Sequence, residues 1–250
     1  KEGPAFDLPI ALGLLVASGQ LDRPKLDGLW CAGELGLDGS LRPCRGVIAF
    51  ADLARQQGAR ALIVPPANAP EAALIPNLKI WTANNLKELV QQLKGECPVV
   101  RVEHNPSPQP ATPAAMPLEP LGLGIEGMDR AAHALALAAA GGHHLLMVGP
   151  PGCGKTHLAR QLPLLLPPLT TSESLTITRI HSVAGEFDTS EPLLHQRPFR
   201  CAHHSCSGAA LLGGGHTPKP GEISLAHGGV LFLDELAEFP RRVLDLLRQP

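Results

Sequence analysis

Apolar and polar residues follow the periods of short helices and strands over roughly the first hundred positions of the chain. The clearest helix begins after Asn85, a capping residue, and ends at Gly95, with apolar side chains spaced along one face. The apolar run at 61–64 is stopped by two prolines, which is typical of a short buried strand. Further helices are expected over 8–17, capped by Asp7, and over 47–57, and two short strands are expected around the Asp38-Gly39 turn.

This pattern stops where prolines recur, at positions 106, 108, 110, 113, 117 and 120, because proline favours extended chain over helix or sheet. We therefore expect an α/β domain over 1–102, a Pro-rich linker over 103–120 and a second domain over 121–250. The second domain contains two continuous apolar runs, 145–148 and 230–233. Such runs indicate buried strands of a parallel sheet that is covered on both faces.

The first of these runs leads directly into the sequence G-P-P-G-C-G-K-T, which matches the phosphate-binding loop G-x-x-x-x-G-K-[ST] at every fixed position. Its glycines allow a sharp turn that brings backbone N–H groups to the phosphates of ATP. Lys155 adds a charge at the β- and γ-phosphates, and the Thr156 hydroxyl can bind Mg²⁺. The alternative is a Gly/Pro turn with an exposed lysine. A helix is expected over 156–162, limited by Pro163. The predicted ATP-binding residues are Gly149, Pro150, Pro151, Gly152, Cys153, Gly154, Lys155 and Thr156.

The second apolar run ends in Asp234-Glu235. A P-loop ATPase needs an acid at the tip of a neighbouring strand to hold Mg²⁺, and Asp234 fits that role together with Thr156. Glu235 is the candidate general base for the attacking water, and Lys155 is the other predicted catalytic residue. The alternative for the acid pair alone is a helix N-terminus enriched in acids. The two motifs together predict Mg²⁺-dependent ATP hydrolysis.

Composition narrows the class of protein further. Apolar residues make up 44% of the chain and the formal net charge is −2, so the chain is globular and gives no global support for nucleic-acid binding. A signal peptide and an apolar run of about 18 residues are both missing, which predicts a soluble, cytoplasmic protein without a membrane partner. The six cysteines are expected to be reduced. Since the chain starts at Lys1 and stops without terminal character, we expect a fragment truncated at both ends.

Cys201, His203, His204 and Cys206 lie close enough in sequence to suggest a zinc site. Zinc usually takes its ligands from two pairs brought together across a fold, whereas these four lie within six residues. Loop packing, a subunit contact or a substrate-facing insert is therefore favoured over zinc. The two histidines at 143–144 are interpreted as the entry to a strand in preference to a nucleotide contact.

Three stretches of the first domain carry a resemblance: K-E-G-P-A at the start, G-E-L-x-L-x-G-x-L-R-P around Glu34, and A-R-A-L-I-V-P-P. They look like the proteolytic domain of Lon proteases. In that family a serine nucleophile follows G-P, and a lysine lies shortly after the second Gly-rich turn. Here the first position is Ala5, and the matching helix start at 46–50 has no lysine. An acyl-transfer dyad needs both groups, so the resemblance implies a Lon/S5-like α/β domain without protease activity.

Three further strings are R-P-F-R-C-A-H-H-S from Arg197, P-G-E-I-S-L-A-H-G-G-V-L-F-L-D-E-L from Pro220, and L-R-Q-P at 247–250. They resemble the signature of the magnesium-chelatase-like AAA+ ATPases of bacteria (YifB/ComM type). The chain departs from that signature at Ala202, a proline in the family, and at Cys153, often a serine; neither change removes a phosphate or Mg²⁺ ligand. The resemblance covers nearly the whole chain. It implies a Lon/S5-like α/β domain followed by a P-loop NTPase (AAA+) parallel-sheet core.

The same resemblance implies ATP and Mg²⁺ as cofactors and a homo-oligomeric ring, a hexamer, that remodels DNA as a branch-migration helicase in recombination or natural transformation. Arg200, His203 and His204 are then candidate DNA contacts. One alternative is the motor subunit of a magnesium-chelatase-type complex that remodels a protein partner. Another is a nucleotide-gated assembly module with negligible turnover. Sensor and arginine-finger residues would lie beyond Pro250, so this chain alone is expected to bind ATP but to hydrolyse it poorly.

Overall fold

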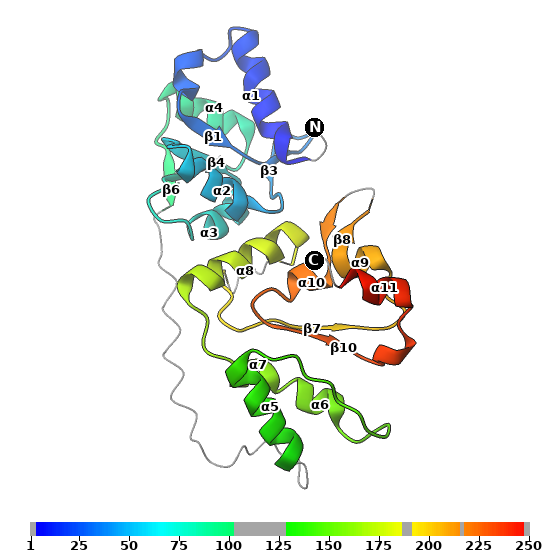
Figure 1. Ribbon diagram of the computed structural model, residues 1–250. Helices are drawn as coiled ribbons and strands as arrows, with labels where there is room; N and C mark the ends of the chain where they lie inside the picture. The colour runs from blue at the N-terminus through cyan, green and yellow to red at the C-terminus, as the bar shows by residue number, and fades with distance from the viewer. Residues whose placement is uncertain (1–3, 103–128, 187–191, 216–217, 248–250) are drawn as a thin grey trace. The chain divides into compact units, whose positions relative to one another are not determined.

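The computed structural model describes residues 4–102, 129–186, 192–215 and 218–247 (Figure 1). The chain divides into two compact units, and the division falls within helix α8, Thr171–Ala184. The first unit contains 4–102 with 178–186 and 192–193, and the second contains 129–177 and the described residues from 194 onward. The expected linker over 103–120 lies outside the described residues, so the domain boundaries stay a prediction.

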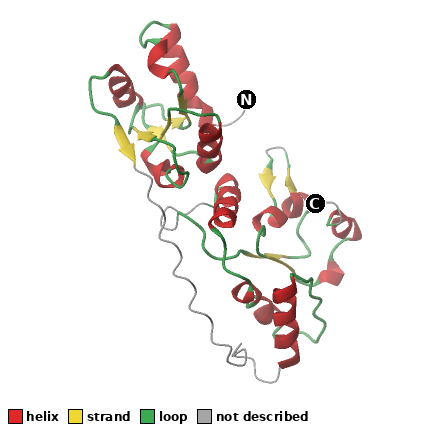
Figure 2. Cartoon of the chain, turned by 60° about the vertical axis from the view of Figure 1, so that its left-hand side comes forward, coloured by secondary structure: helices red, strands yellow, loops and turns green. Residues whose placement is uncertain are grey.

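A four-stranded sheet, in the order β1-β4-β5-β6, lies at the centre of the first unit (yellow in Figure 2). Strands β1 (Leu29–Cys31), β4 (Ala61–Val64) and β5 (Ile80–Thr82) run parallel, and β6 (Val100–Val102) is antiparallel to β5. All four residues of β4 are buried. The apolar run at 61–64 is therefore confirmed as a central strand with neighbours on both edges.

A second pair of strands confirms the expected turn at Asp38-Gly39. Strand β2 (Glu34–Leu35) pairs antiparallel with β3 (Leu41–Arg42). Gly39 has a φ of 81°, in the left-handed region that favours glycine, and the Asp38 carboxylate accepts the backbone N–H of Ser40 over 3.0 Å. Local turn chemistry accounts for this hairpin.

Helix α4 (Leu86–Lys94) begins and ends as the sequence predicts. The Asn85 side chain accepts the backbone N–H of Glu88 over 2.8 Å, and Gly95 ends the helix with a φ of 82°. The remaining helices of the sheet domain are α1 (Asp7–Ala17), α2 (Val47–Gln56) and α3 (Ala69–Ala72), with short 3₁₀ helices at Pro4–Phe6, Arg23–Leu26 and Pro66–Asn68.

The expected capping role of Asp7 is wrong. Asp7 is the first residue of α1, and its side chain does not cap the helix. Its carboxylate instead accepts the backbone N–H of Leu35 in β2, over 3.5 Å. A tertiary contact with the neighbouring strand has replaced the local one.

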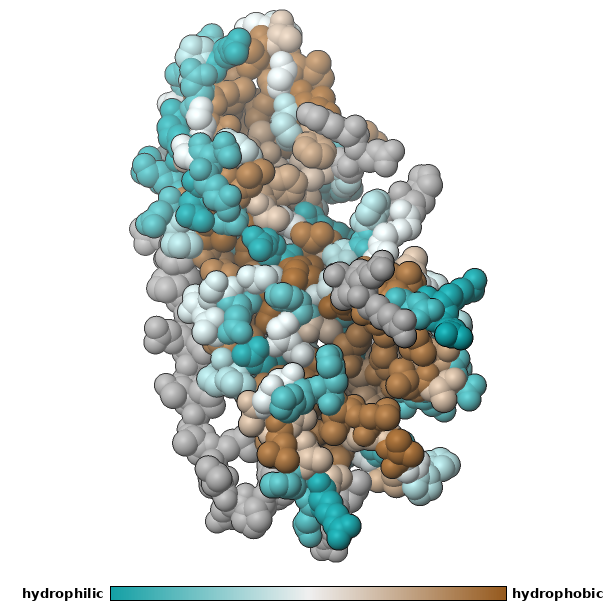
Figure 3. Space-filling view, viewed as in Figure 1, coloured by the Kyte–Doolittle hydropathy of each residue, from teal (hydrophilic) through white to brown (hydrophobic). Residues whose placement is uncertain are grey.

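The core of the first unit forms between α1, β4 and α4. Its buried side chains include Leu8, Ile63 and Leu89. The opposite side of α1 exposes Ile10 and Leu14, at 57% and 66%, and Figure 3 shows hydrophobic side chains over this helix. Helix α1 thus carries apolar residues on both faces, unlike the strongly one-sided α4.

The second unit contains a parallel pair of strands, β7 (Phe199–Ala202) and β10 (Val230–Leu233). This confirms the strand expected at 230–233, although its residues are half-buried because the sheet has only this pair in the described residues. The chain is therefore a mixed α/β protein with parallel strands. No described helix is long and apolar enough to cross a bilayer.

The other elements of the second unit are α5 (Asp129–Gly141), α6 (Lys155–Ala159), α7 (Leu162–Leu165), α9 (Gly208–Leu212), β8 (Gly213–Gly214), β9 (Lys219–Pro220), α10 (Glu222–Leu225), a 3₁₀ helix at Leu236–Glu238, and α11 (Arg241–Leu246).

The apolar run at 145–148 is not a strand, so that prediction is wrong. No described segment pairs with it, and Leu146 and Val148 are 71% and 90% exposed. A strand exists only through hydrogen bonds to a neighbour, and β7 and β10 bond to each other. The helix expected over 156–162 is also shorter, since α6 ends at Ala159 and Pro163 lies in the first turn of α7.

Candidate nucleotide-binding site

The predicted phosphate loop leads from an extended segment into α6. Gly152 and Gly154 have φ values of 76° and 85°, so the chain turns through a region that disfavours other L-residues. Gly154 immediately precedes α6. At Gly149 the reason for glycine is a close approach, because a Cβ atom there would lie 3.1 Å from Sγ of Cys153. The three glycines therefore allow a tight loop, as the motif requires.

The side chain of Lys155 folds back over this loop. Its Nζ donates hydrogen bonds to the carbonyl oxygens of Gly149, over 3.0 Å, and Pro150, over 2.8 Å. Thr156 follows in the first turn of α6 and is half-buried. The cationic group and the hydroxyl that the motif supplies are thus both at the junction between loop and helix.

Helix α6 lies beside the parallel strands. The guanidinium of Arg160, which follows the helix, lies 5.4 Å from the ring centre of Phe199 in β7. Phe199 stacks in turn on Phe232 of β10, with ring centres 6.0 Å apart. A cation–π contact and an aromatic pair therefore tie the phosphate-loop helix to the sheet.

Asp234 and Glu235 follow β10 directly. The backbone N–H of Asp234 donates to the carbonyl oxygen of Ala202 over 3.2 Å, so pairing with β7 extends to this residue. Oδ1 of Asp234 accepts the backbone N–H of Glu235 over 3.1 Å. Glu235 has φ 54° and ψ 50°, a left-handed conformation that costs a non-glycine residue roughly 1–2 kcal/mol. Strain of this kind clusters at functional positions.

His203 and His204 follow β7 as the two acids follow β10. Nδ1 of His204 lies 2.8 Å from Oε2 of Glu235, and Nε2 of His203 lies 3.9 Å from the same oxygen. The sequence analysis did not predict that these histidines meet Glu235. The sequence could have indicated it, because the histidine pair and the acid pair each follow directly after a strand. Neighbouring parallel strands end at the same edge of a sheet, so the residues after them lie close together.

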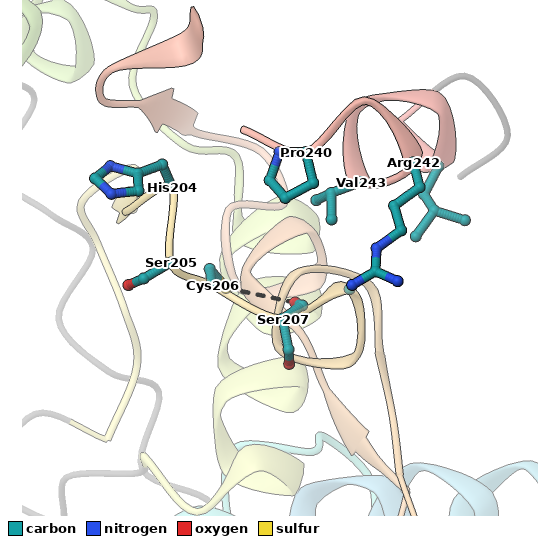
Figure 4. Close-up of a pocket in the computed structure, with 9 residues that line it drawn as sticks. His204, Ser205, Cys206, Ser207, Pro240, Arg242 and Val243 are labelled. Atoms are coloured by element: carbon teal, nitrogen blue, oxygen red, sulfur yellow. Dashed lines mark hydrogen bonds between the residues drawn. The ribbon is translucent and has the colours of Figure 1, made fainter. Parts of the chain in front are cut away.

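The cysteines do not join this group, which contradicts the four-residue zinc hypothesis. In the described part of the chain, the side chains whose ligand atoms converge are His203, His204 and Glu235. Cys206 instead donates its S–H to the carbonyl oxygen of Ser207 over 3.6 Å (Figure 4). Burial raises the pKa of both the Cys201 and Cys206 thiols, which makes them poorer metal ligands near neutral pH.

A pocket lies between the loop at 204–208 and α11. Figure 4 shows the His204 ring pointing away from Pro240, Val243 and Arg242, which line the other side. The phosphate loop does not line this pocket. No hydrogen bond or ion pair among the described residues joins the loop at 149–156 to Asp234 or Glu235. The phosphate loop and the residues at the strand ends thus belong to the same unit but are not joined by a hydrogen bond or an ion pair.

Arg200, a candidate DNA contact, is engaged within the second unit. Its Nε donates to Oε2 of Glu222 over 2.7 Å and its Nη2 donates to Oε1 over 3.0 Å. This two-pronged ion pair joins β7 to α10. The histidines at 143–144 are exposed and precede no assigned strand.

The positions of the Lon-type dyad carry apolar groups. Ala5 has a methyl side chain, and its carbonyl oxygen accepts the backbone N–H of Gly33 over 3.1 Å. The next residue, Phe6, meets Phe50 of α2 edge to face, with ring centres 6.4 Å apart. Aromatic packing occupies the region where the resemblance would require a lysine.

A phosphate-loop sequence ahead of α6 and an acid pair at the end of a parallel strand are typical of the P-loop ATPase class of α/β proteins. Residues 123–250 match the family model described as "Magnesium chelatase, subunit ChlI", and residues 1–68 match the one described as "Subunit ChlI of Mg-chelatase". The chain belongs to this magnesium-chelatase-like family of AAA+ ATPases.

Curated relatives agree with this family. The chain is 44% identical over 250 residues to "Uncharacterized protein YifB" of Salmonella typhimurium, covering all of this chain and 48% of that protein. It is 46% identical over 253 residues to "Competence protein ComM" of Haemophilus influenzae, again covering all of this chain and 48% of the relative. A weaker similarity, 32% over 128 residues, links 46% of the chain to 22% of "Lon protease 2" of Bacillus subtilis. The chain spans about half the length of the first two relatives.

Proposed function

We propose that this chain binds ATP and supplies most of the catalytic groups of a Mg²⁺-dependent ATPase. The observation that carries the proposal is the phosphate loop, in which Gly152 and Gly154 turn the backbone into α6 and Lys155 holds its ammonium group against the loop. Residues 149–154 would cradle the phosphates with backbone N–H groups. Lys155 would exchange its two carbonyl partners for the β- and γ-phosphates, which are stronger acceptors.

The oxygen donors available fit Mg²⁺. Thr156 offers a hydroxyl and Asp234 a carboxylate, and oxygen ligands are those that Mg²⁺ prefers. The hydrogen bond from the backbone of Glu235 to Asp234 holds that carboxylate in one orientation, as is common for metal-binding acids. When bound, Mg²⁺ would neutralise negative charge on the phosphate oxygens.

Glu235 would orient and deprotonate the attacking water. Its left-handed backbone lets the chain turn directly after Asp234, so that the two neighbouring acids can serve different groups. In the structure its carboxylate lies against His204. For catalysis the carboxylate must leave that partner or share it with water.

We further propose that hydrolysis needs residues outside this chain. Two apolar side chains that precede the phosphate loop, Leu146 and Val148, are exposed, so part of this apolar run has no packing partner in the described residues. Further parts of a longer protein, and a neighbouring subunit in a homo-oligomeric ring, would cover this surface and supply the sensor and the arginine finger. The chain alone is then expected to bind ATP and to turn it over slowly. A turnover rate equal to that of the longer protein would contradict this.

The work driven by hydrolysis is proposed to be DNA remodelling, in the manner of a branch-migration helicase. The support is the similarity to a relative named as a competence protein. The family description favours a second candidate, a chelatase-type motor that acts on a protein partner. The third is an assembly module with little turnover.

The test is the ATPase rate of a full-length protein containing this chain, with and without single-stranded, duplex and forked DNA over a salt series. Glu235→Gln is the control for background turnover. DNA stimulation that fades with rising salt, as counterion release requires, supports the DNA motor. An unchanged rate with every DNA would reject it and favour a protein partner. ATP-dependent oligomers without turnover would favour the assembly module.

A further inference from the structure

We propose that His203, His204 and Glu235 form a binding site for one divalent transition-metal cation, of which Zn²⁺ is the reference ion. Its ligands include two imidazole nitrogens, which distinguishes this site from the oxygen-only Mg²⁺ site assigned to Thr156 and Asp234. Its existence does not rest on the proposed ATPase activity, because it follows from the positions of three side chains at the ends of β7 and β10.

The distances between the ligand atoms suit a single cation. One ring nitrogen of each histidine and one carboxylate oxygen of Glu235 all lie within 4.8 Å of one another. Zinc bonds of about 2.1 Å in a tetrahedral arrangement set neighbouring ligand atoms roughly 3.4 Å apart. The measured separations from Glu235 Oε2, 2.8 Å to His204 and 3.9 Å to His203, lie on either side of that value.

Small side-chain rotations can close the remaining differences. The side chains of His203 and Glu235 are 60% and 58% exposed, so both have room to turn, although the His203 ring lies 3.9 Å from the His204 ring and contacts Ser205. The backbone beneath them is defined by contrast, since His203 follows a strand that pairs with β10 through all four residues. A cation would therefore meet an almost assembled set of ligands.

Nδ1 of His204 gives the strongest indication that this set of three side chains lacks a bound ligand. This Nδ1 is shielded from solvent and makes no hydrogen bond of good geometry, although the Glu235 oxygen is only 2.8 Å away. A buried polar atom without such a bond is costly. A cation bound between the imidazole and the carboxylate would satisfy both.

A neighbouring hydroxyl fits the same arrangement. Nδ1 of His203 lies 2.9 Å from Oγ of Ser205, while its Nε2 faces Glu235. In the structure this Nδ1 also accepts the backbone N–H of Ser205 over 3.3 Å. With a metal on Nε2, Nδ1 would instead carry the proton and donate it to the hydroxyl, and the backbone N–H would lose this acceptor. Metal-binding histidines commonly donate their other ring nitrogen in this way, which fixes the ring and raises its basicity.

The ligand set selects the class of metal. Two imidazoles and one carboxylate suit Zn²⁺, Co²⁺ and similar ions, whereas Mg²⁺ and Ca²⁺ prefer oxygen ligands alone. Three protein ligands leave a further coordination position for water. Cys201 and Cys206 contribute nothing to the site, which separates this proposal from a cysteine-based zinc motif.

The direct test is titration of the 250-residue chain, without a polyhistidine tag or nucleotide, with Co²⁺ followed by visible absorbance and with Zn²⁺ followed by calorimetry. One equivalent should bind. His203→Ala and His204→Ala should each weaken binding by more than the 10- to 100-fold that loss of an outer-shell partner costs, and Ser205→Ala should weaken it by about that amount. The matched controls His143→Ala and Cys201→Ser with Cys206→Ser should bind as the unchanged chain does.

Two results would overturn the site. One is failure of the chain to bind either ion while its circular dichroism spectrum shows it folded. The other is a variant pattern opposite to the expected one, with affinity unchanged in both histidine variants or lost in the cysteine variant. Because circular dichroism is recorded for every variant, loss of binding through unfolding is recognised and such a variant is replaced by His203→Gln or His204→Gln.

One consequence does rest on the proposed function. A bound cation engages the carboxylate assigned to the attacking water, so Zn²⁺ should inhibit ATP hydrolysis at fixed Mg²⁺, and His203→Gln should shift that inhibition to higher Zn²⁺. Binding without inhibition would leave the metal site intact and reject the role of Glu235. Absence of binding would reject the metal site and leave the ATPase proposal untouched.

Discussion

The carboxylate of Glu71 accepts the backbone N–H of Ile48 over 2.9 Å and so caps helix α2 from a different element, α3. Helix α2 needs this partner because the residue at its start, Gly46, has no side chain with which to cap it. Glu71 is 2% exposed, and Asn68 and Ser182 also donate hydrogen bonds to it. One buried carboxylate therefore joins the start of α2, Asn68 before α3, and Ser182 in α8 through hydrogen bonds.

This buried acid should make stability depend on pH. Burial raises the pKa of Glu71 above its ordinary value of 4.5, although hydrogen bonds from Ser182, Ile48 and Asn68 oppose the shift. The folded chain then holds the proton more tightly than the unfolded chain, so this group's contribution to the free energy of unfolding is full below pH 4.5 and falls as pH rises through the raised pKa.

Glu71→Gln removes this ionisation. Urea denaturation from about pH 4 to about pH 8 should show the unfolding free energy of the variant improving, relative to the unchanged chain, as pH rises. Glu96→Gln, an exposed acid of the same unit, is the control for loss of a surface charge. A difference between Glu71→Gln and the unchanged chain that stays constant with pH would contradict the raised pKa.

Lys155→Ala should weaken ATP binding by about 10- to 100-fold, the value of a hydrogen bond to a charged group. The fold should survive, because the hydrogen bonds of the lysine stay within its own loop, to the carbonyl oxygens of Gly149 and Pro150 and to Sγ of Cys153. Titration with a fluorescent ATP analogue measures the affinity, and Lys94→Ala, an exposed lysine of the first unit, is the matched control. Equal affinity in both variants would argue that 149–156 is only a turn.

The Arg200–Glu222 pair should contribute about 1–2 kcal/mol to the stability of the second unit, since it is bidentate and partly buried. Arg200→Ala should lower the unfolding free energy by that amount, whereas exposed Arg241→Ala should have little effect. A double-mutant cycle with Glu222→Ala isolates the coupling. If Arg200→Ala leaves stability unchanged and instead weakens DNA binding, the residue serves as a DNA contact.

Ala5→Ser should not confer proteolytic activity. The substitution supplies a hydroxyl, but the residue packed at this place, Phe50, offers no amine to activate it. Hydrolysis of fluorescently labelled casein should remain at background in both the unchanged chain and the variant, with an active Lon protease as positive control. Cleavage by Ala5→Ser above background would show that another side chain acts as the base.

The ends of a helix or strand could be predicted within a residue or two where its start, its apolar face and its stop are all encoded in one short stretch. Helix α4 carries its cap, its apolar face and its terminating glycine in one stretch, and β4 carries an apolar run stopped by prolines. The run at 145–148 has the same apolar character but no strand beside it, so the same rule failed. A strand depends on its neighbour, which the run itself does not encode.

The sequence by itself determined the phosphate loop, the acid pair and the absence of a Lon-type dyad at Ala5, because each depends on residue type at fixed spacing. Only the tertiary structure decided that His204 meets Glu235 and that the two cysteines do not. The reason is the parallel pairing of β7 with β10, which aligns Ala202 with Leu233 and so brings the residues after both strands to one edge of the sheet. Side chains 31 positions apart become neighbours there, while Cys201 and Cys206 remain apart from the converging ligand atoms.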